Sequence, residues 1–315
     1  MIVDTEEEFD WNAPFDRNAV GVSAVAEIWR LQRVLEPFGV KPTYVVDYPI
    51  AATDESARVF ADLARQNLCE VGAHLHPWVN PPHREVVSGH ASFACNLGAE
   101  LEFEKISILR QAIVDGLGLV PLSYKAGRYG LGATSVAALE ALGFHVDLSV
   151  NPHMDYTALG GPSFLGLGAG PAFFGHRRRL LEVPCTTGFI GMARGAGESL
   201  HRFASSAWAT PLRAVGILAR SGVVNRVMLS PEGSSLAEMQ ALTRALYQDG
   251  IRTFSLTFHS PSLKPGCTPY VRTVEDRDRF LDTVTRYVRF FMDELHGVPT
   301  TPVTLFQQLS NDRPS

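Results

Sequence analysis

A regular alternation between short β-type runs and longer stretches of helical periodicity constrains the fold most strongly. The runs predicted as strands are Ile2–Thr5, Thr43–Asp47, Glu70–His74, Ser123–Ala126, His145–Leu148, Val227–Leu229, Thr253–Phe258 and Pro302–Leu305. The predicted helices are Val22–Pro37, Ser56–Gln66, Leu101–Leu117, Ser135–Leu142, Leu236–Gln248 and Val274–Leu295. Neighbouring parallel strands need a long crossover connection, usually a helix. The alternation therefore predicts an α/β fold, a barrel of roughly seven or eight parallel strands.

The length of 315 residues would allow two domains, but one α/β barrel with insertions can also fill it. The stretch GGPSFLGLGAGPAFFG interrupts the alternation and is rich in glycine, proline and phenylalanine. Because apolar residues occur throughout it, we interpret it as an insertion and not as a linker. We expect a single domain over residues 1–315, with an insertion or lid-like loop around residues 151–180.

The charge balance limits the possible partners of this chain. Lys and Arg total 28 against 33 Asp and Glu, without long runs of one sign, which argues against nucleic acid or an anionic membrane as the main partner. No apolar run approaches the ~20 residues of a membrane span. The chain begins with acidic residues instead of a basic leader, and its cysteines show no CxxC pairing. These features predict a cytoplasmic protein.

Two stretches at predicted strand ends carry the residue types of a metal site. In VDTEEEFDW, Asp4 and Glu6 project together, because side chains two apart on a strand share a face. In GAHLHPW the same holds for His74 and His76. One carboxylate and two imidazoles form the ligand set of a catalytic zinc site, which also suits other first-row divalent ions. Asp4 would remain as a free carboxylate able to take a proton from water.

Each of these patterns also has a simpler interpretation. Acidic residues after a strand often form a solvated helix start, and an HxH pair is often a surface or core feature. Three further strand ends carry Arg128, Asp147 and His259, which singly could be a structural ion pair, a turn cap and a buried histidine. Active sites of barrels collect at the C-terminal ends of the strands, so their joint occurrence there predicts a functional site.

These motifs resemble those of the polysaccharide deacetylases with NodB homology, carbohydrate esterase family four. Within the family, DTEEEFDW, HLHPW, AGRYG and SPEG are most similar to the WalW-type branch, which is associated with lipopolysaccharide biosynthesis. The family's five motifs have counterparts here in order, so the likeness spans most of the chain. It implies a distorted (β/α) barrel of about seven strands and a single polysaccharide-deacetylase-like domain.

The first two motifs of the family supply a catalytic base and the metal ligands. By this resemblance Asp4 is the base and Glu6 the ligand, although the family's usual ligand is Asp, and Glu7 and Glu8 remain alternatives. EVGAH matches the second motif up to its first histidine, but the second histidine follows here after only one residue. The implied metal ligands are Glu6, His74 and His76. The ion is expected to be Zn²⁺, with Co²⁺, Ni²⁺ or Mn²⁺ as alternatives.

The remaining motifs supply the rest of the acid–base machinery. In the family, the third motif forms one wall of the groove and orients the base; GRYG supplies Arg128 and Tyr129 for this motif without its usual Pro, while Lys125 occupies a place where another basic residue could serve. Asp147 corresponds to the acid of the fourth motif, which tunes the histidine of the fifth. That histidine is His259, which would protonate the leaving amine.

The implied function is a metal-dependent deacetylase that removes an acetyl group from an N-acetylated sugar or glycan precursor, in lipopolysaccharide or surface-polysaccharide biosynthesis. Tyr129, Trp78 and Trp11 are the expected substrate-binding residues. One alternative is a catalytically silent glycan-binding barrel that uses the same aromatic residues as stacking platforms. Another is a metal-independent amide hydrolase of the same superfamily, which lacks the metal ligands. A metal assay separates these hypotheses, because neither alternative needs an ion.

Overall fold

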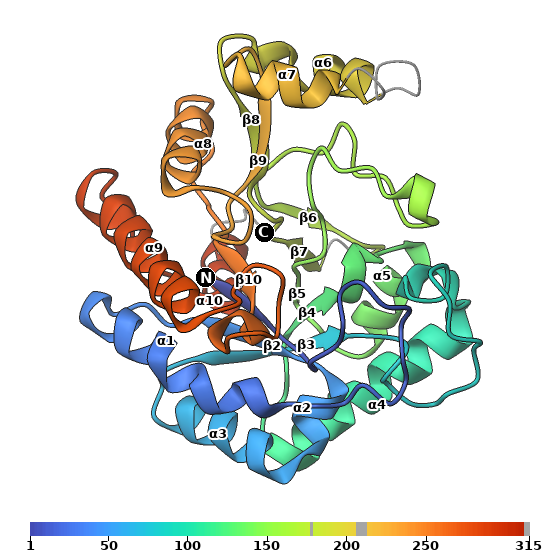
Figure 1. Ribbon diagram of the computed structural model, residues 1–315. Helices are drawn as coiled ribbons and strands as arrows, with labels where there is room; N and C mark the ends of the chain where they lie inside the picture. Colours follow the sequence, from blue (N-terminus) through green and yellow to red (C-terminus); the bar gives the residue numbers. More distant parts are fainter. Residues whose placement is uncertain (177–178, 206–212, 312–315) are drawn as a thin grey trace.

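The computed structural model describes residues 1–176, 179–205 and 213–311 of the chain (Figure 1). Its centre is an eight-stranded sheet with the order β10-β1-β2-β3-β4-β5-β7-β6. The strands are β1 (Ile2–Thr5), β2 (Thr43–Val46), β3 (Glu70–Leu75), β4 (Ser123–Ala126), β5 (Val146–Asp147), β6 (Ala172–Phe174), β7 (Leu180–Glu182) and β10 (Thr257–His259). Neighbours are parallel except β6, which is antiparallel to β7. The sheet curls into a half-barrel, which confirms the predicted α/β class and distorted (β/α) barrel.

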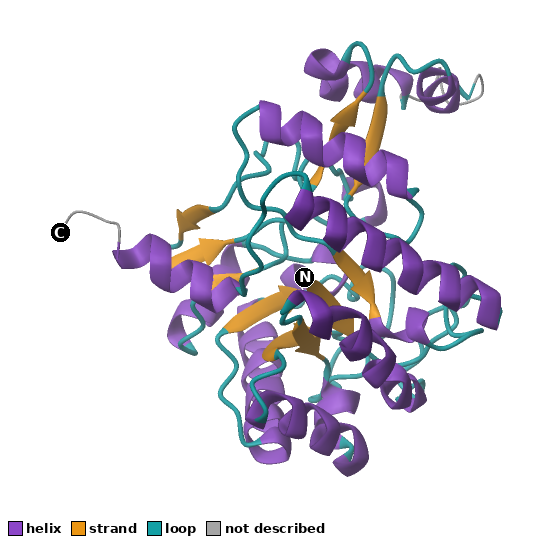
Figure 2. Ribbon diagram, turned by 90° about the vertical axis from the view of Figure 1, so that its left-hand side faces the viewer, coloured by secondary structure: helices purple, strands orange, loops and turns teal. Residues whose placement is uncertain are grey.

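Helices connect the strands and cover the sheet (Figures 1 and 2). They are α1 (Ile28–Leu35), α2 (Tyr48–Ala52), α3 (Asp54–Arg65), α4 (Ala99–Leu117), α5 (Ala133–Ala141), α6 (Gly197–Ala204), α7 (Ala214–Arg220), α8 (Leu236–Gln248), α9 (Val274–Asp293) and α10 (Pro302–Asn311). Strands β1, β2 and β4 are buried at every position, as expected for parallel strands that are covered on both faces. Among the described residues, no helix is both long and apolar enough to cross a membrane.

The sheet register places the chemically active side chains. In the pairing of β1 with β10, Asp4 lies beside His259. In the pairing of β3 with β4, His74 lies beside Lys125. These residues are at the C-terminal ends of their strands, where parallel strands present side chains to a common mouth.

Two predicted strands have a different role in the structure. Pro302–Leu305 is the first part of helix α10, where proline at the helix start leaves no hydrogen bond unmade. The predicted strand at Val227 is part of β9 (Asn225–Met228), which pairs antiparallel with β8 (Thr187–Ile190) in a separate ribbon. Figures 1 and 2 show α6 and α7 at the far end of this ribbon, away from the main sheet.

The expected insertion around residues 151–180 is only partly a loop. Strand β6 and the first residue of β7 fall within it, so it completes one edge of the main sheet. Residues 177–178 of this region lie outside the described residues. The rest runs from Asn151 to Pro171 and contributes Tyr156 and its neighbours to the mouth of the half-barrel.

Candidate metal centre and acid–base pocket

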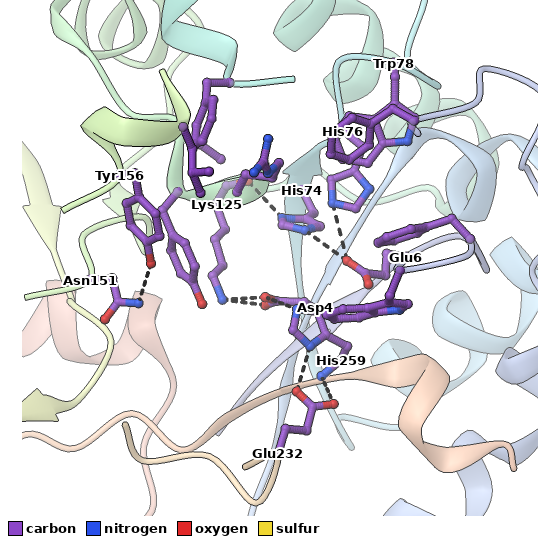
Figure 3. A pocket seen from close by; sticks show the side chains of 18 of the residues that line it. Asp4, Glu6, His74, His76, Trp78, Lys125, Asn151, Tyr156, Glu232 and His259 are labelled. Atoms are coloured by element: carbon purple, nitrogen blue, oxygen red, sulfur yellow. Dashed lines mark hydrogen bonds and ion pairs between the residues drawn. The ribbon is translucent and has the colours of Figure 1, made fainter. Parts of the chain in front are cut away.

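A pocket of about 450 Å³ lies at the C-terminal ends of β1, β3, β4 and β10. Figure 3 shows its acidic and histidine side chains gathered on one side, with Tyr156 and Asn151 on the other. The structure thus brings most of the predicted site residues to one place. Asp147 is the exception, because it does not line this pocket.

Glu6, His74 and His76 converge at one end of the pocket. Glu6 Oε2 lies 3.5 Å from His74 Nε2 and 3.4 Å from His76 Nε2. All three side chains are buried, and their ligand atoms lie within 4.8 Å of one another. This is the arrangement expected for a candidate metal centre; His74 reaches it from within β3, and His76 from the position directly after the last residue of that strand.

The hydrogen bonds around these residues fit a bound cation. His74 Nδ1 contacts Lys125 O at 3.0 Å, and His76 Nδ1 contacts Glu7 Oε2 at 2.8 Å. Donation from each Nδ1 leaves the Nε2 lone pair facing Glu6, as in metal-ligating histidines. Glu6 Oε1 is buried and has no hydrogen-bond partner among the described residues. Acceptor atoms that converge in this way repel one another unless a cation lies among them.

The three neighbouring glutamates have different environments. Glu7 Oε1 accepts a hydrogen bond from Trp78 Nε1 at 2.8 Å, while Oε2 contacts His76 Nδ1, so Glu7 supports His76 on the side away from Glu6. Burial raises the pKa of Glu7 to about 7. Glu8 points away and accepts hydrogen bonds from Ser23 Oγ. Of the three glutamates, Glu6 alone has its carboxylate near the Nε2 atoms of both His74 and His76.

Asp4 is held by Lys125 and not by the predicted Arg128. Lys125 Nζ donates to both carboxylate oxygens of Asp4, at 2.7 and 2.6 Å. Burial alone would raise the pKa of Asp4, but the charges of Lys125, His74 and His259 outweigh it and lower the pKa. Asp4 is therefore an ionised carboxylate beside the candidate metal centre.

The expected contact of Arg128 with the base is wrong for a positional reason. Lys125 lies within β4 and its side chain reaches Asp4 on the inner face of the sheet, whereas Arg128 follows the strand in a turn with φ of 52°. Its Nη1 donates instead to Ser92 Oγ at 2.6 Å and to Gly89 O at 3.3 Å. Arg128 still lines the pocket, at a place away from Asp4.

His259 is paired with Glu232, a residue to which the sequence analysis gave no role. His259 Nδ1 lies 2.7 Å from Glu232 Oε2, and His259 Nε2 lies 3.8 Å from Asp4 Oδ2. Burial would lower the pKa of His259, but the charges of Glu232, Glu6 and Asp4 outweigh it and raise the pKa to about 10. The raised pKa favours the protonated imidazolium of His259, whose Nε2 is directed toward Asp4 (Figure 3).

The predicted pairing of Asp147 with His259 is wrong. Four strands separate β5, which carries Asp147, from β10 in the order of the sheet. Asp147 accepts a hydrogen bond from Ser149 Oγ at 2.7 Å, and its pKa is raised by burial while it shares a hydrogen bond with Glu182. The motif SPEG contains Glu232, but its distance from His259 along the chain gave no sign of the contact.

The three predicted substrate-binding aromatics fall into two groups. Trp11 and Tyr129 are half-buried and line the pocket; Trp11 packs edge-on against His259, with ring centroids 4.9 Å apart. Trp78 is only 2% exposed and stacks on His76 at 4.2 Å. Its indole therefore holds His76 in place and offers little surface to a sugar.

No protein-family model matches the chain, and no curated protein matches it. Among solved structures, it is similar to Puue allantoinase, with 11% identity, a TM-score of 0.57, and coverage of 100% of this chain and 90% of that one. It is also similar to a GH57 branching enzyme from the archaeon Thermococcus kodakaraensis, with 10% identity, a TM-score of 0.50, and coverage of 100% and 71%.

A further similar structure is a protein from Mycobacterium smegmatis described as a polysaccharide deacetylase. It has 16% identity and a TM-score of 0.46, over 88% of this chain and 80% of that one. At these identities the likenesses show the fold alone, and the WalW-type branch stays a prediction.

Proposed function

We propose that this protein is a metal-dependent deacetylase that removes an acetyl group from the nitrogen of an acetylated sugar or glycan precursor. The observation that carries the proposal is the convergence of Glu6 Oε2, His74 Nε2 and His76 Nε2 beside Asp4. Carboxylate and imidazole ligands suit Zn²⁺, and also Co²⁺, Ni²⁺ or Mn²⁺. A divalent ion held there would supply Lewis acidity toward the acyl carbonyl and toward water.

The residues around that centre provide a base and an acid. Asp4, kept ionised by Lys125, accepts the proton of the water that attacks the acyl carbon. His259 then donates a proton from Nε2 to the departing nitrogen. Glu232 accepts from Nδ1 of the same ring, so it fixes the ring's orientation and stabilises its positive charge.

The pocket has the size and lining of a site for a sugar. Its volume of about 450 Å³ falls in the range of roughly 300–1,000 Å³ typical of small-molecule sites. Trp11 and Tyr129 place aromatic rings along its wall. On the motif resemblance, we propose that the substrate is a precursor of lipopolysaccharide or another surface polysaccharide.

The experiment is an assay of acetate release from N-acetylglucosamine derivatives and short N-acetylated oligosaccharides by the purified protein. We expect release that chelation abolishes and added divalent metal restores. Binding without acetate release would instead favour the glycan-binding barrel. Acetate release that survives complete metal removal would favour the metal-independent amide hydrolase.

A further inference from the structure

Arg128 is a pocket-lining cation that meets no acid. No described carboxylate lies within ion-pair distance of its guanidinium, which is half-buried. Its hydrogen bonds through Nη1 go to the hydroxyl of Ser92 and the carbonyl of Gly89. Partial burial of a charge without an opposite charge costs free energy. Because no described ion pair offsets this cost for Arg128, its position indicates a partner from outside the chain.

The local structure fixes the position of Arg128. Arg128 and Tyr129 both have left-handed backbone conformations, with φ of 52° and 61°. The guanidinium carbon lies 4.3 Å from the ring centroid of Phe93 and 5.1 Å from that of Phe15. A guanidinium that packs by its faces against aromatic rings keeps the N–H groups of its edge available to an anion, and the hydrogen bonds of Arg128 to described residues use Nη1. Strained backbone of this kind is found where the surrounding structure holds a side chain for function.

A second cation lies near the same end of the pocket. Arg226 is half-buried, donates from Nη1 to His153 O at 3.0 Å, and has no ion pair with a described residue. Both guanidiniums interact electrostatically with Tyr156, whose hydroxyl accepts a hydrogen bond from Asn151 at 3.0 Å. Two guanidiniums without an ion pair to a described residue thus lie near Tyr156.

The acids of the pocket do not offset this charge. Asp4 is paired with Lys125, Glu232 with His259, and Glu6 faces the two histidines. Asp10 is the other acid that lines the pocket, and its side chain is exposed. It accepts a hydrogen bond from the backbone N–H of Asn12 and forms no ion pair with Arg128. Apart from the exposed Asp10, the charge in the described pocket that has no opposite partner is thus positive, and it lies away from the candidate metal centre.

We propose that Arg128 is a specificity-determining residue that binds an oxyanion, phosphate or carboxylate, on the substrate whose acyl group lies at the metal centre. This inference rests on the proposed function and names the substrate class: an N-acetylated sugar that carries an anionic group. Arginine suits the task, because its fork of donors matches two oxygens of a phosphate or carboxylate at once.

The test compares four sugars that share one N-acetylated ring. N-acetylglucosamine is the neutral reference, its 1-phosphate and 6-phosphate carry a phosphate, and N-acetylmuramic acid carries a carboxylate. Dissociation constants are measured by calorimetry for the wild type, Arg128→Gln, Arg128→Lys and the control Arg84→Gln. Arg84 is a surface residue that pairs with Glu104 and does not line the pocket.

We expect the wild type to bind at least one anionic sugar more tightly than the neutral one. Arg128→Gln should reduce that preference by roughly 10- to 100-fold, the usual value of a bidentate charged contact. Arg128→Lys should recover part of it, and Arg84→Gln should keep it. A phosphate could also bind the metal. The proposed metal ligands are the same in all four proteins, however, so a loss of preference in Arg128→Gln measures the contribution of Arg128.

The outcomes separate this inference from the proposed function. Which anionic sugar shows the preference identifies phosphate or carboxylate as the group that is bound. A preference that depends on Arg128 without any acetate release would support the anion site and contradict the deacetylase. Equal or absent binding of the anionic sugars, or a preference that persists in a folded Arg128→Gln protein, would overturn the inference. Thermal unfolding of each variant checks that it is folded.

Discussion

The two ends of the pocket hold their charged side chains in different ways. At the metal end, Asp4, His76 and His259 are each fixed by a buried partner from another element: Lys125, Glu7 and Glu232. At the other end, the guanidinium of Arg128 is packed between rings but meets no acid. On the proposed function, the first end is arranged for chemistry before a substrate arrives, as catalytic preorganisation requires. On the further inference, the second end is completed by a ligand.

The largest effect is expected at Asp4. Asp4→Asn removes the base but no proposed metal ligand, so turnover should fall by roughly 10²–10⁴-fold while metal content stays unchanged. Asp16→Asn is the matched control, because Asp16 is exposed and outside the pocket. Steady-state rates and elemental analysis of the two variants test this. Loss of metal from Asp4→Asn would make Asp4 a ligand and move the search for the base to the glutamates.

A smaller effect is expected at Glu7, which contacts His76 on the side away from Glu6. Glu7 accepts from Trp78 and holds His76 Nδ1, and removing such a partner of a ligand usually weakens metal binding by about 10–100-fold. Glu7→Gln should show that loss in a metal titration, and Glu8→Gln should not, because Glu8 contacts Ser23 outside the centre. Equal affinities in the two variants would mean that Glu7 only packs against Trp78.

The pH dependence of the reaction rate should reveal the effect of Glu232 on His259. The Glu232 charge contributes to the raised pKa of His259, which burial alone would lower. Glu232→Gln should lower that pKa, so the proton donor is lost at a lower pH and the alkaline limb of the pH–rate profile moves down by about 1–3 units. Asp147→Asn is the control and should leave the limb in place. A limb that moves in Asp147→Asn and not in Glu232→Gln would restore the pairing predicted from sequence.

Local sequence patterns were sufficient to predict most of the sheet and the metal end. Asp4, Glu6, His74 and His76 follow apolar strands at a spacing of two, so their common face and common mouth could be inferred without coordinates. Strand β1 and helix α8 have the predicted bounds. Such features can be predicted because they depend on the regular spacing of side chains along a single strand or helix.

Contacts between distant segments could not be predicted in the same way. Glu232 and His259 come from different elements, and nothing local to either shows that they meet. Strand β4 has the predicted bounds, so Lys125 was expected inside the strand and Arg128 beyond it; Arg128 was chosen from the motif resemblance, and nothing local showed that Lys125 reaches Asp4 across the sheet. Pro302–Leu305 has a strand-like composition, yet it forms the start of a helix that packs on β5, because tertiary packing overrides weak propensity.

The most direct test of the central claim is the metal content of the folded protein. We predict that the wild type binds about one divalent ion per chain, because Glu6, His74 and His76 form a single three-ligand centre. His74→Ala and His76→Ala should fold and lose the ion, whereas His83→Ala, at an exposed position outside the pocket, should keep it. Elemental analysis after dialysis against metal-free buffer gives the result. Full occupancy in both ligand variants, or a folded wild type that binds no divalent ion, would contradict the account.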